Sequence, residues 1–510
     1  MPNQANNRRI AKNTLLLYMR MLFIMAVQLY TSRVVLNTLG VVDYGLYNVV
    51  GGIVTMFAFL NGAMITSTQR YLTFELGRGD KERLKVVFTT CIQIHLLISL
   101  MIVILCETIG LWFFYEKMII PEERINAAFW VYQVSIFTMC VQVLCVPFSS
   151  DIVAHEQMSA FAMISVLEAI LRLAAVFLLL VIDFDHLILY AILLGAVQLI
   201  IRYLYILYCH CHYQESRLIK VFDKHLAKEI AQFMGWNVWG NLAGTLFGTG
   251  LNLLLNVFFG PAVNAARAVA VQVETAVHEF STNFMMAVNP QIIKLYAQGN
   301  LSEMHHLLFR ASKFSFFLLF ALSLPVVLET DFLLTLWLKN VPEYAVIFLR
   351  ILLFIVVIDA VARPSMTAAA ATGNVKLYQS LIGGILLTIV PIAYVVLKLG
   401  GPPYSVYLVH FIICVVAFIT RLLVVRKLIS LSLRQYFSQV ILRCCCVLLV
   451  SGILAYFVRY IIPQSVLGAL TVCLLSSILV LFISYVLGLT SAERSFVHQK
   501  CTEVIHKLHL

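Results

Sequence analysis

The chain has 510 residues, of which 61% are hydrophobic and 12% are charged, and its mean hydropathy is +0.93. Soluble proteins devote about a quarter of their residues to charged side chains, so this composition excludes a soluble globular enzyme. A membrane-spanning helix needs about 20 mostly apolar residues. Fourteen such segments can be read along the chain, with no room left for a catalytic domain outside the membrane. We therefore predict an all-α integral membrane protein with 14 transmembrane helices.

The predicted helices follow one another closely, with polar residues confined to short loops and the two ends. Their ranges are 13–36, 42–65, 86–114, 126–148, 160–182, 187–209, 232–259, 262–289, 308–328, 344–362, 377–398, 404–425, 439–461 and 466–488. The basic start MPNQANNRRIAKN has no cleavage-type signal, so we expect the first helix to remain as an anchor. Most of the twelve cysteines lie in apolar segments, where they act as small hydrophobic residues, and we expect neither disulfides nor redox chemistry.

The basic residues are distributed unevenly between alternate loops. If both termini are cytoplasmic, 25 of the 36 Lys and Arg residues fall in inside segments, 5 in outside loops and 6 within helices. Such a bias is typical of the positive-inside rule, and it predicts cytoplasmic termini and an even number of spans. It also accounts for the net charge of +11, so we expect no nucleic-acid partner.

The chain also matches itself at a shift of 220 residues, which becomes 217 towards the end of each half. The matched pairs are Ile10-Ala11 with Ile230-Ala231, Gly40 with Gly260, Gly79-Asp80 with Gly299-Asn300, and Pro147 with Pro364. This order predicts two six-helix lobes related by a pseudo-two-fold axis along the membrane normal, plus two extra C-terminal helices. The predicted boundaries are 1–209 for the N-lobe, 210–228 for a cytoplasmic linker, 229–425 for the C-lobe, and 426–510 for the last two helices and a cytoplasmic tail. This architecture is typical of transporters that work by alternating access.

The segment RVVLNTLGVVDYGLY at 33–47, with Gln69-Arg70 and Gly79-Asp80, resembles the opening of bacterial polysaccharide flippases of the MOP (MATE-like) superfamily, the Wzx type. The resemblance implies transport of an undecaprenyl-pyrophosphate-linked oligosaccharide from the cytoplasmic to the periplasmic leaflet, for O-antigen or capsule biosynthesis. It places the protein in the bacterial inner membrane and implies no catalytic residues. Membrane lipid and polysaccharide polymerase or assembly proteins are the implied partners. One chain contains both lobes, so a monomer suffices.

Two predicted helices carry polar stripes that a lipid-facing helix could not keep. In 262–289 the residues Asn264, Arg267, Glu274 and His278 fall within an arc of about 100°. In 232–259 the stripe contains Asn237, Asn241 and Asn252. For the asparagines, lining of a substrate cavity and hydrogen bonding between helices both remain open, whereas the glycines between them favour close helix packing.

Buried cations are the candidate ligands for a pyrophosphate head group, because guanidinium groups match phosphate oxygens in bidentate fashion. We expect Arg20, Arg172 and Arg267 to take this role, and expect Arg33 and Arg350 to anchor at the membrane interface. Two helical pairs, Glu168 with Arg172 and Asp359 with Arg363, are four residues apart and can neutralise each other. Whether these pairs are structural or bind substrate remains open.

Glu274, His278 and Asp359 are candidates for proton or sodium coupling, since acidic and imidazole groups inside a membrane are functional candidates. A hydrogen bond between Glu274 and His278 that stabilises the lobe is the alternative. The run Cys209-His210-Cys211-His212 resembles a metal cluster, but alternate residues at a helix end point in different directions, and we expect no metal site. No Walker sequence is present, so we expect no ATP hydrolysis and no cofactor.

Three other functions fit parts of the pattern. A MATE-like cation-coupled drug antiporter would share the superfamily but usually has an acid-rich pocket. A lipid II flippase would share the whole layout. A polysaccharide polymerase or ligase would be an enzyme, but it would need a large outside loop, and the longest one here, near 116–124, is short and acidic.

Overall fold

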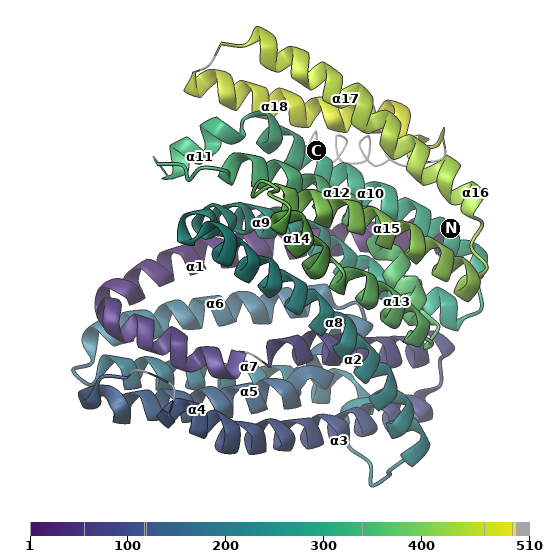
Figure 1. The fold of residues 1–510 in the computed structure, drawn as a ribbon. Helices are drawn as coiled ribbons and strands as arrows, with labels where there is room; N and C mark the ends of the chain where they lie inside the picture. Colours follow the sequence, from purple (N-terminus) through teal and green to yellow (C-terminus); the bar gives the residue numbers. More distant parts are fainter. Residues whose placement is uncertain are drawn as a thin grey trace, which may run out of the picture. The chain divides into compact units, whose positions relative to one another are not determined.

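The structure is a computed structural model that describes residues 2–495 except 56, 117, 119, 339, 464 and 492; side chains are described from Arg9 onwards, with gaps between residues 29 and 58. Every long element in this part of the chain is a helix (Figure 1). Twelve of the described helices or helix runs are long and apolar enough to cross a membrane. The all-helical membrane architecture is thus confirmed.

Within the described part of the first half, the chain forms seven α-helices. They are α1 (Pro2–Thr55), α2 (Ala58–Arg78), α3 (Lys81–Leu105), α4 (Leu111–Glu116), α5 (Ile125–Ala154), α6 (Met158–Val181) and α7 (His186–His212). A π-helical segment joins α3 to α4, and short 3-10 turns precede α5 and follow α7 at Gln214–Ser216. The long α1 combines the first predicted helix with the start of the second, and it changes direction at Gly40, where φ is 74° and ψ is 170°.

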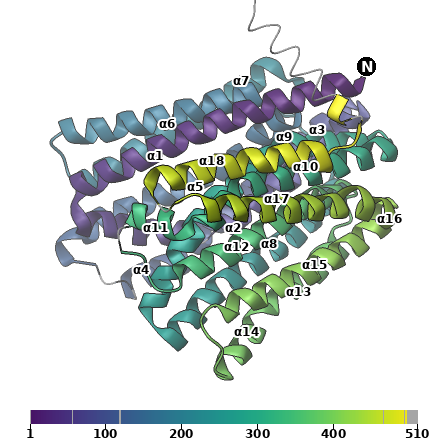
Figure 2. The same ribbon diagram turned by 90° about the horizontal axis from the view of Figure 1, so that it is seen from above.

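The described residues of the second half form eleven α-helices. They are α8 (Lys224–Phe259), α9 (Pro261–Ala297), α10 (Leu301–Leu328), α11 (Thr330–Leu338), α12 (Ala345–Ala371), α13 (Lys376–Leu387), α14 (Ile389–Lys398), α15 (Ser405–Ile429), α16 (Leu433–Tyr436), α17 (Leu442–Ile461) and α18 (Val466–Ile483). The last two form a hairpin whose arms run side by side (Figure 2).

The chain divides into two compact units. The N unit contains Met1–Leu242 and Met286–Gly299, and the C unit contains Ala243–Met285 and Asn300–Leu510. The divisions fall inside α8 and inside α9, so each of these helices begins in one unit and ends in the other. The division by compactness therefore does not follow the linker at 210–228, which was the predicted boundary between lobes.

Each unit has its own packed interior. In the N unit α5 packs against α7, α2 and α3, while α1 packs against α6. A buried cluster of Leu17, Val153, Met158 and Ala287 joins α1, α5, α6 and the end of α9. In the C unit α12 lies between α10 and α15, and its buried side chains include many alanines. Small side chains let membrane helices approach closely, which is the main source of packing energy where lipid replaces water.

The local geometry repeats at the positions that the sequence comparison aligned. Gly40 and Gly260 both have positive φ, at 74° and 79°, and Gly79 and Gly299 do so at 78° and 74°. This left-handed conformation is readily adopted only by glycine, and it ends a helix at Gly79. The next residue then caps the following helix in both halves: Asp80 accepts from the Arg83 N–H, and Asn300 accepts from the Glu303 N–H.

The two predicted spans that are missing from the twelve are related by the same shift. They are 42–65 and 262–289, and each follows one of the positive-φ glycines. Both regions are helical in the described backbone. Region 262–289 contains Arg267, Glu274 and Glu279, which lower its mean hydropathy. Many side chains of 42–65 lie outside the described residues, so this span stays a prediction.

Candidate functional site

A polar cavity of about 520 Å³ lies within the N unit, between α1, α2, α5, α6 and α7. Its polar lining includes Asn61, Gln142, Arg172 and Gln198, and the hydroxyl groups of Tyr47, Ser135 and Thr138. None of the described residues that line it is aspartate or glutamate. Amide, hydroxyl and guanidinium groups together can donate and accept hydrogen bonds, which suits a polar, uncharged or anionic ligand.

Arg172 enters this cavity from α6 while holding a carboxylate on its own helix. Its Nη2 and Nε donate to Glu168 Oε1 at 2.7 and 3.2 Å, so the ion pair that the four-residue spacing predicted is present. The Arg172 side chain is 41% exposed, and its Nη1 makes no hydrogen bond to the part of the chain that the structure describes. The guanidinium can therefore bind a ligand without giving up Glu168.

The same carboxylate starts a row of polar groups that extends from the cavity to α1. Gln198 Nε2 donates to Glu168 Oε1 at 2.9 Å, and Arg202 Nη2 donates to Gln198 Oε1 at 2.9 Å. These pairs form because residues four apart lie on one face of a helix, 168 with 172 on α6 and 198 with 202 on α7. Sequence reasoning placed Arg202 within a helix but gave it no role, although its spacing from Gln198 was visible.

Aromatic rings extend this row to Arg20. The Arg202 guanidinium lies 5.9 Å from the centre of the Tyr205 ring, and the Tyr205 and Phe161 rings are 6.2 Å apart. Arg20 of α1 lies over the other end, 4.7 Å from the centre of the Phe161 ring. We call Arg20, Arg172, Arg202, Glu168 and Gln198 the cationic row. Two of the three predicted head-group ligands thus belong to one feature, which contains three guanidinium groups and one carboxylate.

The two predicted asparagines in the N unit make local contacts. Asn237 is 6% exposed, and its Nδ2 donates to the Phe233 carbonyl oxygen one turn earlier at 2.8 Å. Asn241 Nδ2 donates at 3.3 Å to the carbonyl oxygen of Phe59, at the start of α2. Asn241 therefore joins two helices, and neither asparagine is among the residues that line the described cavity.

In the C unit, the predicted coupling residues meet around an arginine. Arg363 Nε lies 3.3 Å from Asp359 Oδ2, and its Nη2 contacts His278 Nε2. Asp359 Oδ1 lies 3.3 Å from Arg421 Nη1, and Arg421 is 7% exposed. Asp359 and His278 are therefore held by Arg363, which joins α9 to α12.

Glu274 does not pair with His278 as one reading of the sequence predicted. It accepts from Thr275 Oγ1 at 3.4 Å, and no hydrogen bond to His278 exists among the described residues. The four-residue spacing brings the two onto one face, but His278 is engaged by Arg363 instead. Glu274 still interacts electrostatically with Asp359 and Arg363, so it belongs to the same charged neighbourhood.

The remaining predicted residues of the C unit connect α8 with α9. Arg267 donates from Nη2 to the Gly248 carbonyl oxygen at 2.8 Å and from Nη1 to Asn252 Oδ1 at 3.4 Å. Asn264 has a buried Oδ1 that no hydrogen-bond donor of the described residues reaches. The two polar stripes therefore face each other at this point.

Two charged residues of the C unit, Arg363 and Arg421, lie inside α12 and α15. Arg421 falls within its predicted helix at 404–425, whereas Arg363 lies one residue beyond the predicted end at 362. Both helices continue beyond the predicted ends at 362 and 425. The apolar residues on both sides of Arg421, in FITRLLVV, were the available signal. Arg350 pairs with Asp331 at 2.8 Å near the start of α12, and the Arg33 side chain lies outside the described residues.

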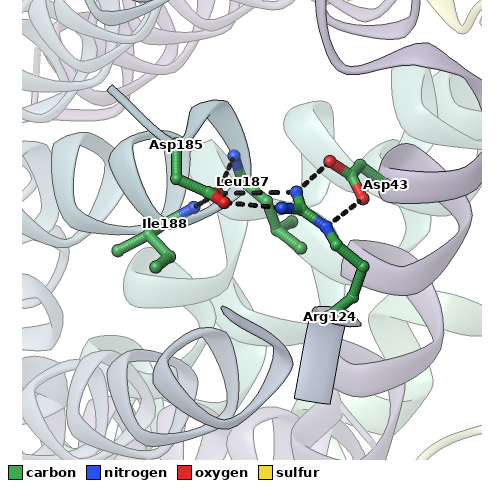
Figure 3. Close-up of polar contacts among 5 residues, drawn as sticks. All are labelled: Asp43, Arg124, Asp185, Leu187 and Ile188. Carbon is green, nitrogen blue, oxygen red and sulfur yellow. Dashed lines mark hydrogen bonds and ion pairs between the residues drawn. The ribbon is translucent and has the colours of Figure 1, made fainter. Parts of the chain in front are cut away.

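A second arginine cluster fixes the segment that carried the family resemblance (Figure 3). Arg124 donates from Nε to Asp43 Oδ1 at 2.9 Å and contacts Asp43 again through Nη2. Its Nη1 donates to Asp185 Oδ2 at 2.6 Å. Asp185 also caps α7 by accepting from the N–H groups of Leu187 and Ile188.

Asp185 is held in its ionised form by this arrangement. Burial alone would raise the pKa of Asp185, but the Ile188 N–H, the Arg124 guanidinium and the Leu187 N–H together lower it. We call Asp43, Arg124 and Asp185 the Arg124 clamp. It joins α1, the turn before α5 and the start of α7, which explains why an aspartate stands in the VVDYG segment.

Comparison with known proteins identifies the fold. The structure is similar to an outward-facing multidrug resistance MATE family transporter of the MOP superfamily, with a TM-score of 0.71, 14% identity, and coverage of 82% of this chain and 96% of that chain. The fold of this chain is therefore MATE-like. The MATE transporter ClbM in complex with Rb⁺ is similar at a TM-score of 0.69, with 17% identity and coverage of 84% and 96%.

A further similar structure is a MOP superfamily transporter from Pyrococcus furiosus, with a TM-score of 0.68, 16% identity, and coverage of 82% of this chain and 96% of that chain. The polarity of that protein's binding pocket is described as reversed, suggesting a different function. No protein-family model matches the sequence, and neither does any curated protein. The chain is thus a multi-pass membrane protein with a MATE-like transporter fold, and the resemblance to the MOP superfamily is confirmed at the level of the fold.

Proposed function

We propose that this chain is a flippase that moves an undecaprenyl-pyrophosphate-linked oligosaccharide from the cytoplasmic to the periplasmic leaflet. In this proposal the chain has 14 membrane helices, with two lobes that alternate access and two extra C-terminal helices. Both termini lie in the cytoplasm, and the membrane is the bacterial inner membrane. The transported glycan then serves O-antigen or capsule biosynthesis, with polysaccharide polymerase or assembly proteins as partners.

The single observation that carries this proposal is the cationic row beside a cavity whose described lining contains no aspartate or glutamate. A cationic drug needs a carboxylate at its binding site, because a charge leaving water must be paired. The described cavity offers it an arginine, three amides and three hydroxyls instead. A pyrophosphate carries fixed negative charge and matches guanidinium geometry, and sugars need amide and hydroxyl partners.

The arginines of the two units differ in their exposure. In the N unit, Arg172 lines the cavity beside Glu168, and its side chain is 41% exposed. In the C unit, Arg363 and Arg421 pair with Asp359, and Arg421 is 7% exposed. A buried, paired arginine is less accessible to a ligand, so we assign the C-unit group to structure or ion coupling.

The length of this chain, compared with the part that the MATE structures cover, also favours two additional C-terminal helices. The MATE structures cover 82–84% of this chain. The uncovered sixth or so is close in length to residues 426–510, the predicted addition that contains the α17–α18 hairpin. A lipid-linked substrate keeps its apolar chain in hydrocarbon, and additional membrane helices can border the path of that chain.

Transport in proteoliposomes tests the proposal. The purified chain is reconstituted with a fluorescent undecaprenyl-pyrophosphate-linked oligosaccharide, and its crossing between leaflets is measured. We expect Arg172→Ala to slow crossing about tenfold or more, because a hydrogen bond to a charged group contributes about 1.5–3 kcal/mol. Arg172→Lys should retain part of the rate, since it keeps the charge but loses the bidentate geometry.

Arg350→Ala is the matched control, because it removes an arginine that pairs with Asp331 away from the cavity. With this variant, the lipid-linked oligosaccharide should cross between leaflets at the wild-type rate. Export of tetraphenylphosphonium, a lipophilic cation, is measured in the same vesicles. Export of the cation without crossing of the lipid-linked sugar would overturn the proposal and favour the drug antiporter.

A further inference from the structure

Three metal-ligating side chains converge where α5 ends and the chain leaves α7, a place that the proposed transport function does not use. Asp151 lies in the last turn of α5, His155 follows this helix, and Glu215 lies in the turn Gln214–Ser216. His155 Nε2 is 2.6 Å from Glu215 Oε1 and 3.8 Å from Asp151 Oδ1. One ligand atom from each residue lies within 4.8 Å of the others.

Asp151 is the unusual member of this group. It is 0% exposed, and no hydrogen-bond donor in the described part of the chain reaches either of its carboxylate oxygens. A buried carboxylate without a partner is strongly unfavourable, so such groups normally hold a hydrogen bond, a cation or a metal. The imidazole Nε2 of His155 lies within 4 Å of one carboxylate oxygen of Asp151 and one of Glu215.

The surroundings hold the imidazole in place for ligation. The His155 and Tyr213 rings stack with centres 4.0 Å apart and an angle of 5° between their planes. The His155 backbone oxygen accepts from Arg9 Nη2 at 2.8 Å, which fixes the main chain at this residue. His155 is 25% exposed on its side chain, whereas Glu215 is 10% exposed, so the group has one open side.

We propose that Asp151, His155 and Glu215 bind a divalent transition-metal cation of the Zn²⁺ class, with water at the remaining position. Zinc takes imidazole nitrogen and carboxylate oxygen at about 2.0–2.2 Å, which places tetrahedral ligand atoms about 3.3 Å apart. The observed separations of 2.6 and 3.8 Å lie on either side of this value. Two carboxylates and a neutral imidazole also balance the charge of the ion.

The site ties the linker to α5. Glu215 precedes the connection that leads from α7 to α8, so a bound ion would hold the first turn of this connection against the end of α5. Metal binding of this kind stabilises the folded state, because the ligands are far apart in the unfolded chain. The proposal concerns stability of the N unit and does not depend on which molecule is transported.

The test uses the full-length chain, purified with a tag that contains no histidine, stripped with EDTA and separated from free metal. Zn²⁺ is added back, bound metal is counted by mass spectrometry, and thermal unfolding is followed. We expect one tightly bound Zn²⁺ per chain and a higher unfolding temperature. Asp151→Asn, His155→Ala and Glu215→Gln should each weaken Zn²⁺ binding by more than the roughly tenfold that even an outer-shell change costs.

The matched control removes other ligands of the same helix end. Cys211 and His212 are exposed at the end of α7, so the double variant Cys211→Ser/His212→Ala should keep the bound ion. Loss of binding in this control with retention in Asp151→Asn would overturn the proposal. Equal stabilisation by Mg²⁺ or Ca²⁺ would also overturn it, since an imidazole site favours transition metals.

The metal site can also be tested on the wild-type chain alone, so the test does not depend on whether the ligand variants fold. Co²⁺ added to the wild-type chain should give the visible absorption of a four-coordinate site, with an imidazole ligand detected by X-ray absorption. A wild-type chain that retains neither Zn²⁺ nor Co²⁺ after gel filtration would refute the metal site directly.

Discussion

A buried ion pair in the C unit gives the sharpest prediction about stability. Lys313 of α10 is 1% exposed on its side chain, and its Nζ lies 2.6 Å from Glu493 Oε2 and 2.9 Å from Oε1. Glu493 follows α18, so this pair joins α10 to the chain beyond the α17–α18 hairpin. Lys313→Met keeps most of the side-chain volume but leaves a buried carboxylate without its cation.

The expected cost of Lys313→Met is about 3 kcal/mol in the free energy of unfolding. Breaking a buried pair on one side typically costs about 3–5 kcal/mol, because the remaining charge loses its compensation. The lower end applies because Glu493 Oε2 still accepts from the Thr490 N–H at 2.8 Å. The double variant Lys313→Met/Glu493→Gln should recover most of the loss, since it removes both charges.

Unfolding of the detergent-solubilised protein, followed by intrinsic fluorescence against heat and denaturant, measures these differences. Arg350→Met is the control, because its pair with Asp331 is 40% and 72% exposed on the two side chains and should contribute only about 0–1 kcal/mol. A Lys313→Met variant that loses no more stability than Arg350→Met would refute the reasoning, as would a double variant less stable than the single one.

The stabilisation by the Lys313–Glu493 pair depends on pH. Burial alone would raise the pKa of Glu493, but hydrogen bonds from Lys313 and the Thr490 N–H lower it below its ordinary value. A carboxyl group with a lowered folded-state pKa stabilises the fold above its unfolded pKa of about 4.3, and this contribution is lost as the pH falls through the folded-state pKa. Unfolding measured from pH 7 to pH 3 should therefore show an acid-dependent loss that Glu493→Gln reduces.

Three other outcomes are expected. Arg124→Ala should destabilise the N unit by about 2 kcal/mol in thermal unfolding, because Asp43 and Asp185 lose charge-assisted hydrogen bonds, and Arg124→Lys should restore only part of this. Asp185→Asn should remove an acid-dependent loss of stability below about pH 4, because the lowered pKa of Asp185 stabilises the fold only above that range. Gly468→Ala should cost about 1–3 kcal/mol through collision of its Cβ with the Pro463 carbonyl oxygen, whereas Gly452→Ala meets no atom within 4 Å and should be neutral or stabilising by about 0.5–1 kcal/mol.

The helical framework could be predicted because membrane insertion depends on local composition. A window of about 20 residues contains the information that decides a span, and the described helices agree with the predicted ones to within a few residues at most ends. The turns at Gly79 and Gly299 could likewise be read from glycine followed by Asp or Asn. The segment 262–289 is an exception, because Arg267, Glu274 and Glu279 weaken the same local signal.

The clusters could be predicted only in part, since they join residues that are distant in sequence. Helical spacing revealed the pair of Glu168 with Arg172, but Arg421 reaches Asp359 across 62 positions. The approach of Glu215 to His155 spans 60 positions and depends on where the chain leaves α7. Such contacts are set by the packing of helices, which composition and periodicity do not encode.

The number of cationic side chains in the membrane helices therefore does not identify a substrate-binding site. The exposure and pairing of each cation are more informative. Arg363 and Arg421 each form an ion pair with Asp359, as expected where a charge must remain in a low-dielectric environment without ligand. Arg172 differs, because its side chain is 41% exposed and lines a cavity that has no competing acid among its described lining. An anion entering that cavity would complete the coordination of Arg172, whereas a cation would have to displace it from Glu168. This asymmetry, more than the net charge of +11, favours an anionic head group over a cationic drug.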